Sequence, residues 1–142
     1  MTKLLDDHNH DTRHGLKELF RDGIYTPRYT MTLEEERELA YQRVKKVKNC
    51  DDICPIKKVD CCQVCDSQLV SVKDFWTNPR NIFAMHEAAG LADGSLATKL
   101  TVQFNLFGGT VLKLGTEKHH NLLCEGIDSF TKVGCFALTE LG

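Results

Sequence analysis

The chain has 142 residues, 42% of them hydrophobic, which is enough to bury the core of one domain. Its 18 basic and 20 acidic residues leave a formal net charge of −2, so composition favours neither nucleic acid nor an anionic membrane as a partner. No apolar stretch is long enough to span a bilayer, and the first residues lack the apolar core of a secretory signal, so we expect no membrane span.

The first predicted element is a helix over residues 11–21, with Asp11 as its N-cap and apolar residues recurring at spacings of three and four. Gly23 is expected to end this helix. Residues 24–29 should form an extended connector, because Pro27 disfavours a helical conformation in the residue before it.

A second helix is predicted to begin with a capping box made by Thr32 and Glu35. Acidic residues follow the cap and lysines gather near the end, which is the polarity that the helix dipole favours. The residues expected on its buried face are Ala40, Val44 and Val47.

Residues 49–76 break the helical pattern and contain five of the seven cysteines. An odd count in a chain without a secretory signal argues against a disulfide framework and leaves reduced thiols or a metal site. The weak candidates for a zinc site are Cys54, Cys61, Cys62 and Cys65, of which the last two have the two-residue spacing of zinc ligands. The separation of the first two is shorter than that between usual zinc knuckles, which favours an inserted loop with reduced thiols.

A further helix is predicted to begin at Pro79, with Asn78 as its N-cap, and to end at Gly90. Asp93 or Ser95 should then cap a further helix. Its apolar face is formed by Leu96, Leu100, Phe104 and Phe107, and the glycine pair Gly108 and Gly109 is expected to interrupt it.

The last predicted helix starts at Thr116 and Glu117, and residues 133–138 are predicted to form a short apolar strand. His119 and His120 point about 100° apart on a helix, which favours surface or packing roles over one shared metal. The two remaining cysteines, Cys124 and Cys135, have apolar neighbours and are expected to be small core residues.

Four motifs in order resemble the acyl-CoA oxidases of the acyl-CoA dehydrogenase superfamily. They are Asp-Gly-Ser-Leu-Ala-Thr-Lys at 93–99, Phe-Asn-Leu-Phe-Gly-Gly at 104–109, Leu-Gly-Thr-Glu-Lys-His-His at 114–120, and Gly-Cys-Phe-Ala-Leu-Thr-Glu-Leu-Gly at 134–142. The segments 16–20 and 25–29 also look like the start of that family. Leu141 stands where the related dehydrogenases carry proline, which favours the oxidases.

The resemblance implies a mainly α fold. Residues 1–132 would form the N-terminal helical domain, with a cysteine-rich insert at about 49–76. Residues 133–142 would be the first strand of a truncated flavin-binding β-domain. We therefore expect an N-terminal fragment or a short isoform.

By resemblance, the full-length protein binds FAD and oxidises fatty acyl-CoA with dioxygen, giving trans-2-enoyl-CoA and hydrogen peroxide in fatty acid β-oxidation. The family also implies a peroxisomal location and a homodimer, although the chain itself carries no targeting signal. Two alternatives stay open beside the zinc-binding module: a non-enzymatic interaction module and a fragment of an acyl-CoA dehydrogenase.

The family's catalytic base is a glutamate that lies beyond residue 142, so no catalytic residue is assigned here, and the chain alone is expected to be inactive and without bound FAD. Two cofactor-binding residues are implied. Thr139 would contact the flavin through its hydroxyl or backbone amide, and Gly142 would let the backbone approach it. Phe104 and Phe107 could line an acyl-chain tunnel, although core packing is the more common role of such a stripe.

Overall fold

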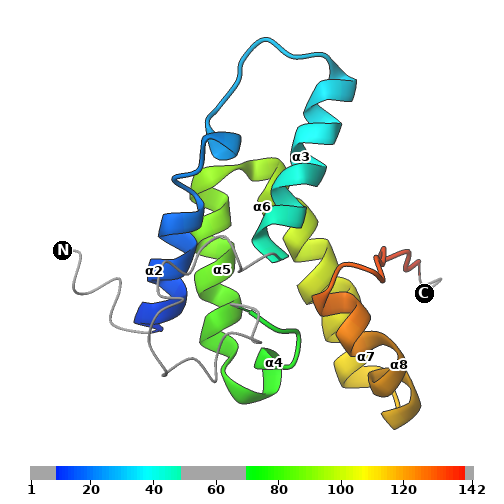
Figure 1. Ribbon diagram of the computed structural model, residues 1–142. Coiled ribbons are helices and arrows are strands. Elements are labelled where there is room, and N and C mark those ends of the chain that lie inside the picture. Colours follow the sequence, from blue (N-terminus) through cyan, green and yellow to red (C-terminus); the bar gives the residue numbers. More distant parts are fainter. Residues whose placement is uncertain (1–8, 49–69, 140–142) are drawn as a thin grey trace.

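The computed structural model describes residues 9–48 and 70–139, and every regular element in these two ranges is a helix (Figure 1). The mainly α fold is thereby confirmed. The helices are α2 (His10–Leu19), η1 (Gly23–Tyr25), α3 (Leu33–Lys48), α4 (Asp74–Thr77), α5 (Pro79–Ala92), α6 (Gly94–Leu100), η3 (Thr101–Gly108), α7 (Gly109–Leu114) and α8 (Glu117–Asp128).

The first helix, α2, differs from its prediction at both ends. Its N-cap is Asn9, in the left-handed conformation with φ 55°, rather than Asp11. A 3₁₀ turn, η1, follows where an extended connector was expected, because the Asp22 carboxylate accepts a hydrogen bond of 2.9 Å from the Ile24 N–H and caps the turn. Only from Thr26, which precedes proline, is the backbone extended as predicted.

Helix α3 confirms the predicted capping box. The Glu35 carboxylate accepts a bond of 2.8 Å from the Thr32 N–H, and the Thr32 hydroxyl accepts one of 3.3 Å from the Glu35 N–H. Ala40 and Val44 are buried as expected, with Val47 packed against the core. The N-terminal half of α3 projects beyond the other helices together with the connector that leads into it (Figure 1).

Helix α5 begins at Pro79 with Asn78 as its N-cap, as predicted, but runs past Gly90 to Ala92. It ends there because Asp93 caps the next helix, with its carboxylate accepting a hydrogen bond of 2.8 Å from the Ser95 N–H. Of the two residues proposed as that cap, the structure selects Asp93.

The predicted interruption at Gly108 and Gly109 is wrong. Both glycines have helical dihedral angles, so α6, η3 and α7 follow one another without a break, and η3 has the wider π-helical hydrogen bonding. Gly108 serves close packing: a Cβ atom there would lie 2.5 Å from Cγ2 of Val72. The missing side chain lets the segment before α4 lie against this helix.

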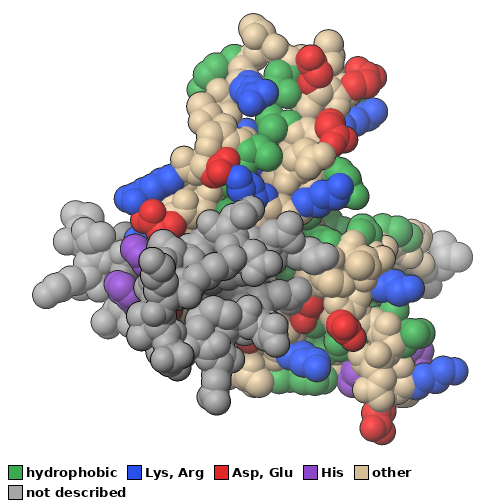
Figure 2. All heavy atoms as spheres, in the orientation of Figure 1, with side chains coloured by type: hydrophobic (Ala, Val, Ile, Leu, Met, Phe, Trp, Pro, Cys, Tyr) green, Lys and Arg blue, Asp and Glu red, His purple; other side chains and the backbone are tan. Residues whose placement is uncertain are grey.

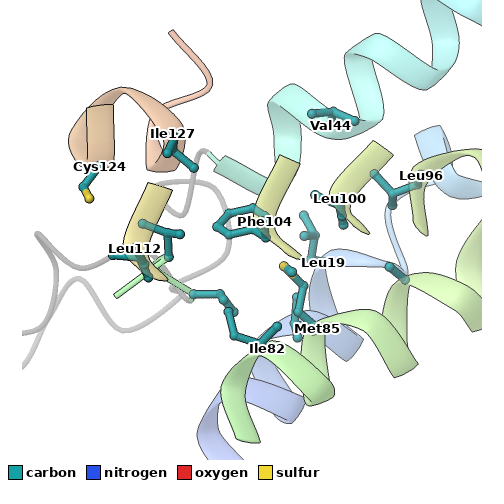
Figure 3. Packing of buried hydrophobic residues seen from close by; sticks show 14 of the residues in the cluster. Leu19, Val44, Ile82, Met85, Leu96, Leu100, Phe104, Leu112, Cys124 and Ile127 are labelled. Carbon is teal, nitrogen blue, oxygen red and sulfur yellow. The ribbon is translucent and has the colours of Figure 1, made fainter. Parts of the chain in front are cut away.

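The hydrophobic core lies where α2 and α5 meet the continuous α6–η3–α7 rod, and Figure 3 shows its side chains converging from these helices. Helix α3 covers α6, and α8 packs on α7 and η3. The fully buried large side chains are Leu16, Val72, Ile82, Met85, Leu96, Leu100, Cys124 and Ile127. Cys124 is thus the small core residue that was predicted.

Residues 133–139 follow α8 and form neither helix nor strand, so the predicted strand is absent from this structure. A strand needs a neighbour to pair its backbone groups, and the described ranges contain no other strand. Cys135 is exposed for the same reason, which corrects its predicted burial. The division into domains at residue 132 stays a prediction.

Candidate functional site

The segment of residues 133–139 contains one of the two predicted cofactor-binding residues. Thr139 is described and exposed, whereas Gly142 lies outside the described residues. In Figure 1 this segment leaves the molecule beside α7 and α8, at the opposite side from α2.

Apolar side chains in this segment face solvent. Val133 is 75% exposed, Leu138 61% and Phe136 46%. Large apolar side chains left in water are costly, which suits a segment that another layer covers.

The chain reaches this segment through a tight corner after α8. Phe130 adopts the left-handed conformation with φ 52°, which is uncommon for a bulky residue. Its ring lies edge-on to Phe104 of η3, with 5.8 Å between the centroids. The Lys132 N–H then donates a bond of 2.9 Å back to the carbonyl of Gly126, which closes the corner.

Gln103 of η3 lies behind this corner and is only 3% exposed. Its side-chain N–H groups donate to the carbonyls of Ile127, at 3.1 Å, and Lys132, at 2.7 Å. Its carbonyl oxygen accepts a bond of 3.3 Å from the Gly134 N–H. One amide therefore contacts backbone groups before, within and after the corner.

Two glycines let the corner close. A Cβ atom at Gly126 would lie 2.2 Å from Cγ of Lys132, and one at Gly134 would lie 2.0 Å from Cγ of Phe107. The backbone at Gly134 thus lies directly on the Phe107 ring.

Asp128 ends α8 and fastens it to the segment that precedes α4. Its carboxylate accepts bonds of 2.6 Å from the Ser71 hydroxyl and from the Val72 N–H. Burial raises the pKa of this carboxyl above its ordinary value, although both hydrogen bonds act to lower it.

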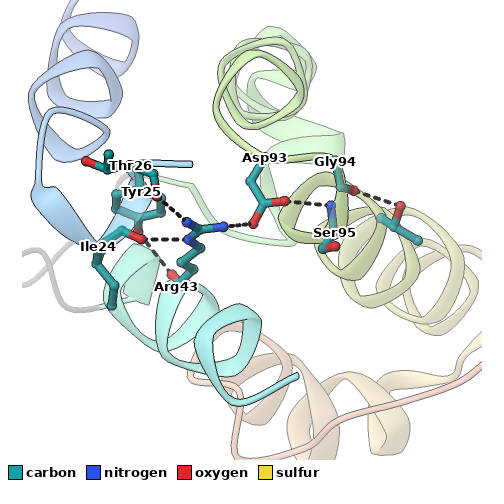
Figure 4. Close-up of polar contacts among 8 residues, drawn as sticks. Ile24, Tyr25, Thr26, Arg43, Asp93, Gly94 and Ser95 are labelled. Carbon is teal, nitrogen blue, oxygen red and sulfur yellow. Dashed lines mark hydrogen bonds and ion pairs between the residues drawn. The ribbon is translucent and has the colours of Figure 1, made fainter. Parts of the chain in front are cut away.

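A second buried polar group lies on α3 (Figure 4). The Arg43 guanidinium donates to the carbonyls of Ile24, at 2.7 Å, and Thr26, at 3.1 Å. It also forms an ion pair of 2.6 Å with Asp93, the cap of α6. The Tyr25 hydroxyl donates to the Arg43 carbonyl, and burial raises the pKa of this phenol. Each of the three guanidinium nitrogens has a partner, which indicates a structural role for this cluster.

The prediction of surface or packing roles for the two histidines is confirmed, with His119 exposed and His120 partly buried. The His119 ring nitrogen Nδ1 accepts a bond of 3.2 Å from the Thr116 N–H at the start of α8. His120 contacts the Val111 carbonyl through Nε2, at 3.0 Å, and its ring lies edge-on to Trp76.

The weak zinc candidates Cys54, Cys61, Cys62 and Cys65 lie outside the described residues. Within residues 9–48 and 70–139, no group of three or more metal-binding side chains comes together. The described helices also include none with the length and apolar character needed to cross a membrane.

Phe104 lies inside the core with 2% of its surface exposed, and the partly buried Phe107 packs against this core. These positions agree with core packing rather than with the wall of an acyl-chain tunnel. A shallow groove lies instead between the connector, α3 and the start of α6, where Arg28, Met31 and Leu39 line it. Charges of both signs are interspersed among the described residues on the face seen in Figure 2.

Comparison with known proteins gives one consistent result. Over 95 residues, covering 61% of this chain and 14% of the relative, the sequence is 41% identical to "Acyl-coenzyme A oxidase 2, peroxisomal" of Arabidopsis thaliana. It is 29% identical to "Putative acyl-coenzyme A oxidase 3.2, peroxisomal" of the same plant, covering all of this chain and 21% of that protein. It is 30% identical to "Peroxisomal acyl-coenzyme A oxidase 3" of Homo sapiens, over 82% of this chain and 14% of that protein.

The resemblance predicted from the four motifs is therefore confirmed, and the relatives named here are peroxisomal. The chain spans between 14% and 21% of the length of these relatives. No model of a protein family matches the chain, and no solved structure matches it.

Proposed function

On the premise that the chain is a relative of the acyl-coenzyme A oxidases, we propose that it supplies the helical portion of a peroxisomal, FAD-dependent oxidase of fatty acyl-CoA. Residues 133–139 carry Thr139 from this helical body to the flavin. The observation that supports the proposal is this exposed apolar segment, which leaves the helices at a corner held by buried contacts.

The residues present fit such a contact. Thr139 is exposed, and a hydroxyl both donates and accepts hydrogen bonds, which suits the polar edge of an isoalloxazine ring. The exposed side chains of Phe136 and Leu138 offer apolar surface on either side of Ala137. Gly142 remains a proposed second contact.

The flavin would supply hydride acceptance from the substrate's β-carbon, with dioxygen as the final oxidant. Removal of the α-proton needs a positioned base, and we assign that role to no described residue of this chain. A fatty acyl-CoA substrate and a homodimeric assembly are proposed for the whole protein on the same premise.

A chimera tests the proposal. The part of Arabidopsis putative acyl-coenzyme A oxidase 3.2 that matches the whole of this chain is replaced by the chain, and the purified protein is examined for visible flavin absorbance. We expect bound FAD and release of hydrogen peroxide from a fatty acyl-CoA. A folded chimera that binds no FAD would contradict the proposal.

Thr139 is tested within that chimera. Thr139→Val should weaken FAD binding by about tenfold, which corresponds to one hydrogen bond to the cofactor. Thr131→Val is the matched control, because Thr131 is also exposed and its hydroxyl shares a hydrogen bond of 2.8 Å with the Ser129 hydroxyl. Equal FAD affinity in both variants would remove Thr139 from the site.

A further inference from the structure

We propose that Gln103 is a positioning residue that directs the segment bearing Thr139 away from the helical body along one path. The purpose given to that path rests on the proposed function. The restraint itself is a property of this chain and is argued from its contacts.

The three hydrogen bonds of Gln103 reach three successive parts of the chain. Ile127 belongs to the last turn of α8, Lys132 to the corner, and Gly134 to the departing segment. Because the side chain is 3% exposed, water cannot readily replace these partners. Removing the side-chain amide of Gln103 would leave the carbonyls of Ile127 and Lys132 and the N–H of Gly134 without these hydrogen bonds.

Aromatic contacts from the same helix reinforce this restraint on both sides. Phe104 meets the Phe130 ring at the start of the corner, and Phe107 lies against Gly134 at its end. Gln103, Phe104 and Phe107 all belong to η3, so one π-helical segment provides these three contacts, beside the bond from Lys132 to Gly126 of α8. Figure 3 shows Phe104 between the core side chains and Ile127. Widened helical turns of this kind often occur at functional sites.

The restraint limits where Thr139 can lie. Thr139 is the fifth residue after Gly134, and a fully extended chain spans at most about 3.6 Å per residue, so Thr139 stays within roughly 18 Å of Gly134. A site held by a buried residue on a helix is more exact than one held by a loop alone. Gln103 would thereby act on the cofactor contact without touching the cofactor.

The test uses the chain itself and needs no flavin. In Gln103→Met, a side chain of similar size makes none of the three bonds. We expect the Gly134 amide to exchange with solvent about tenfold faster, as for the loss of one ordinary hydrogen bond. NMR relaxation should show greater mobility for residues 133–139. Gln42→Met, at an exposed position on α3, is the matched control.

Gln103→Glu separates hydrogen bonding from packing. An ionised carboxylate has no donor for the carbonyls of Ile127 and Lys132, whereas the protonated form has one. The mobility of residues 133–139 should therefore be high at neutral pH and fall as the pH is lowered. A residue that only fills space would show no such recovery.

Gly134→Ala keeps the proposal testable if the Gln103 variants unfold. The added Cβ would collide with Phe107, so the departing segment should become mobile while the Lys132 carbonyl keeps its bond. Amides in α5 report in every variant whether the fold persists. Unchanged Gly134 exchange in a folded Gln103→Met variant would overturn the inference. Altered exchange together with a chimera that binds no FAD would overturn only the proposed function.

Discussion

Arg43 and Gln103 are the two buried polar residues of the described part of the chain. Each holds a connecting segment against the helices, in a different region of the molecule. Arg43 fastens the connector between α2 and α3 to the body, and Gln103 fastens the corner after α8. Each does so by binding two backbone carbonyls. The two side chains differ in charge, and this difference decides whether the side chain requires a counterion.

The charged residue requires a counterion and the neutral one does not. Asp93 lies beside Arg43, and the two side chains are only 10% and 12% exposed, so removing either leaves the other charge buried. Gln103 instead accepts the Gly134 N–H with its own oxygen. Each side chain bonds to three other residues, but the comparison predicts that altering the buried cation costs more stability, because it leaves the charge of Asp93 unpaired.

The largest expected effect tests that statement. Arg43→Met should lower the free energy of unfolding by about 3–5 kcal/mol, because it breaks a buried ion pair and leaves two carbonyls without donors. Chemical denaturation measures the change. Arg37→Met, at an exposed position of the same helix, should change stability by less than about 0.5 kcal/mol.

The ion pair is isolated by adding Asp93→Asn to Arg43→Met. The double variant should lose less stability than the sum of the single losses, since no unpaired charge remains. Strict additivity would show that Arg43 acts through its carbonyl contacts alone.

The glycine pair beside Gln103 gives the next largest effect. Gly108→Ala should destabilise the chain by about 1–3 kcal/mol, because the new Cβ meets buried Val72. Gly109→Ala should instead stabilise it by about 0.5–1 kcal/mol, since its nearest atom would be at 3.8 Å. Thermal unfolding of the two variants gives the signs. Equal changes would mean that the packing around Gly108 is looser than the structure shows.

A smaller effect is expected at the start of α3. Thr32→Ala removes the N-cap and should cost about 1 kcal/mol. The Arg43 contacts should survive, because they lie more than two turns further along the helix. Circular dichroism measures the stability, and Thr30→Ala serves as the control at an exposed position before the helix.

The smallest expected effect is a difference in pH dependence between the connector before α3, which contains Asp22, and the corner after α8, which contains Asp128. Hydrogen bonds from Lys46 and Ile24 lower the folded-state pKa of Asp22 below its unfolded value of 3.8, so its stabilising effect is lost as the pH falls below that value. Asp128 has the opposite sign. Its pKa is raised by burial, so the penalty on its ionised form disappears as the pH falls towards 3.8.

On acidification, amides of the connector at residues 23–26 should therefore lose protection before amides at the corner after α8. Hydrogen exchange followed through this pH range measures the order. The reverse order would show that the two carboxyls do not govern their regions.

Helices and caps were predictable from the sequence because their signals are local. The capping box of α3, Asn78 with Pro79, and the apolar face of α6 depend on residues within one or two turns. The relationship to acyl-CoA oxidases was likewise readable from contiguous motifs. Gly108 was read wrongly because its reason is Val72, a distant neighbour that spacing does not reveal.

The buried roles of Arg43 and Gln103 were not predicted, although the sequence around each residue contains a signal. Arg43 stands three residues after Ala40 and four before Val47, and Gln103 stands three after Leu100 and four before Phe107. A polar residue in the middle of an apolar stripe indicates a buried hydrogen-bonding role. Apart from Asp93, however, the partners of these two side chains are backbone atoms, which no side-chain pattern identifies.

Helices α6, η3 and α7 follow one another without a break, so the number of residues in η3 affects the orientation of α7 as much as their identity does. Successive residues of a helix point in different directions around its axis, about 100° apart in an α-helix such as α7. One residue gained or lost between Thr101 and Gly108 would therefore rotate the remainder of the rod around that axis. A substitution in this stretch acts at its own contacts, whereas a change in its length would displace α7 and α8 together. Related sequences that keep the same corner should therefore align through η3 without gaps.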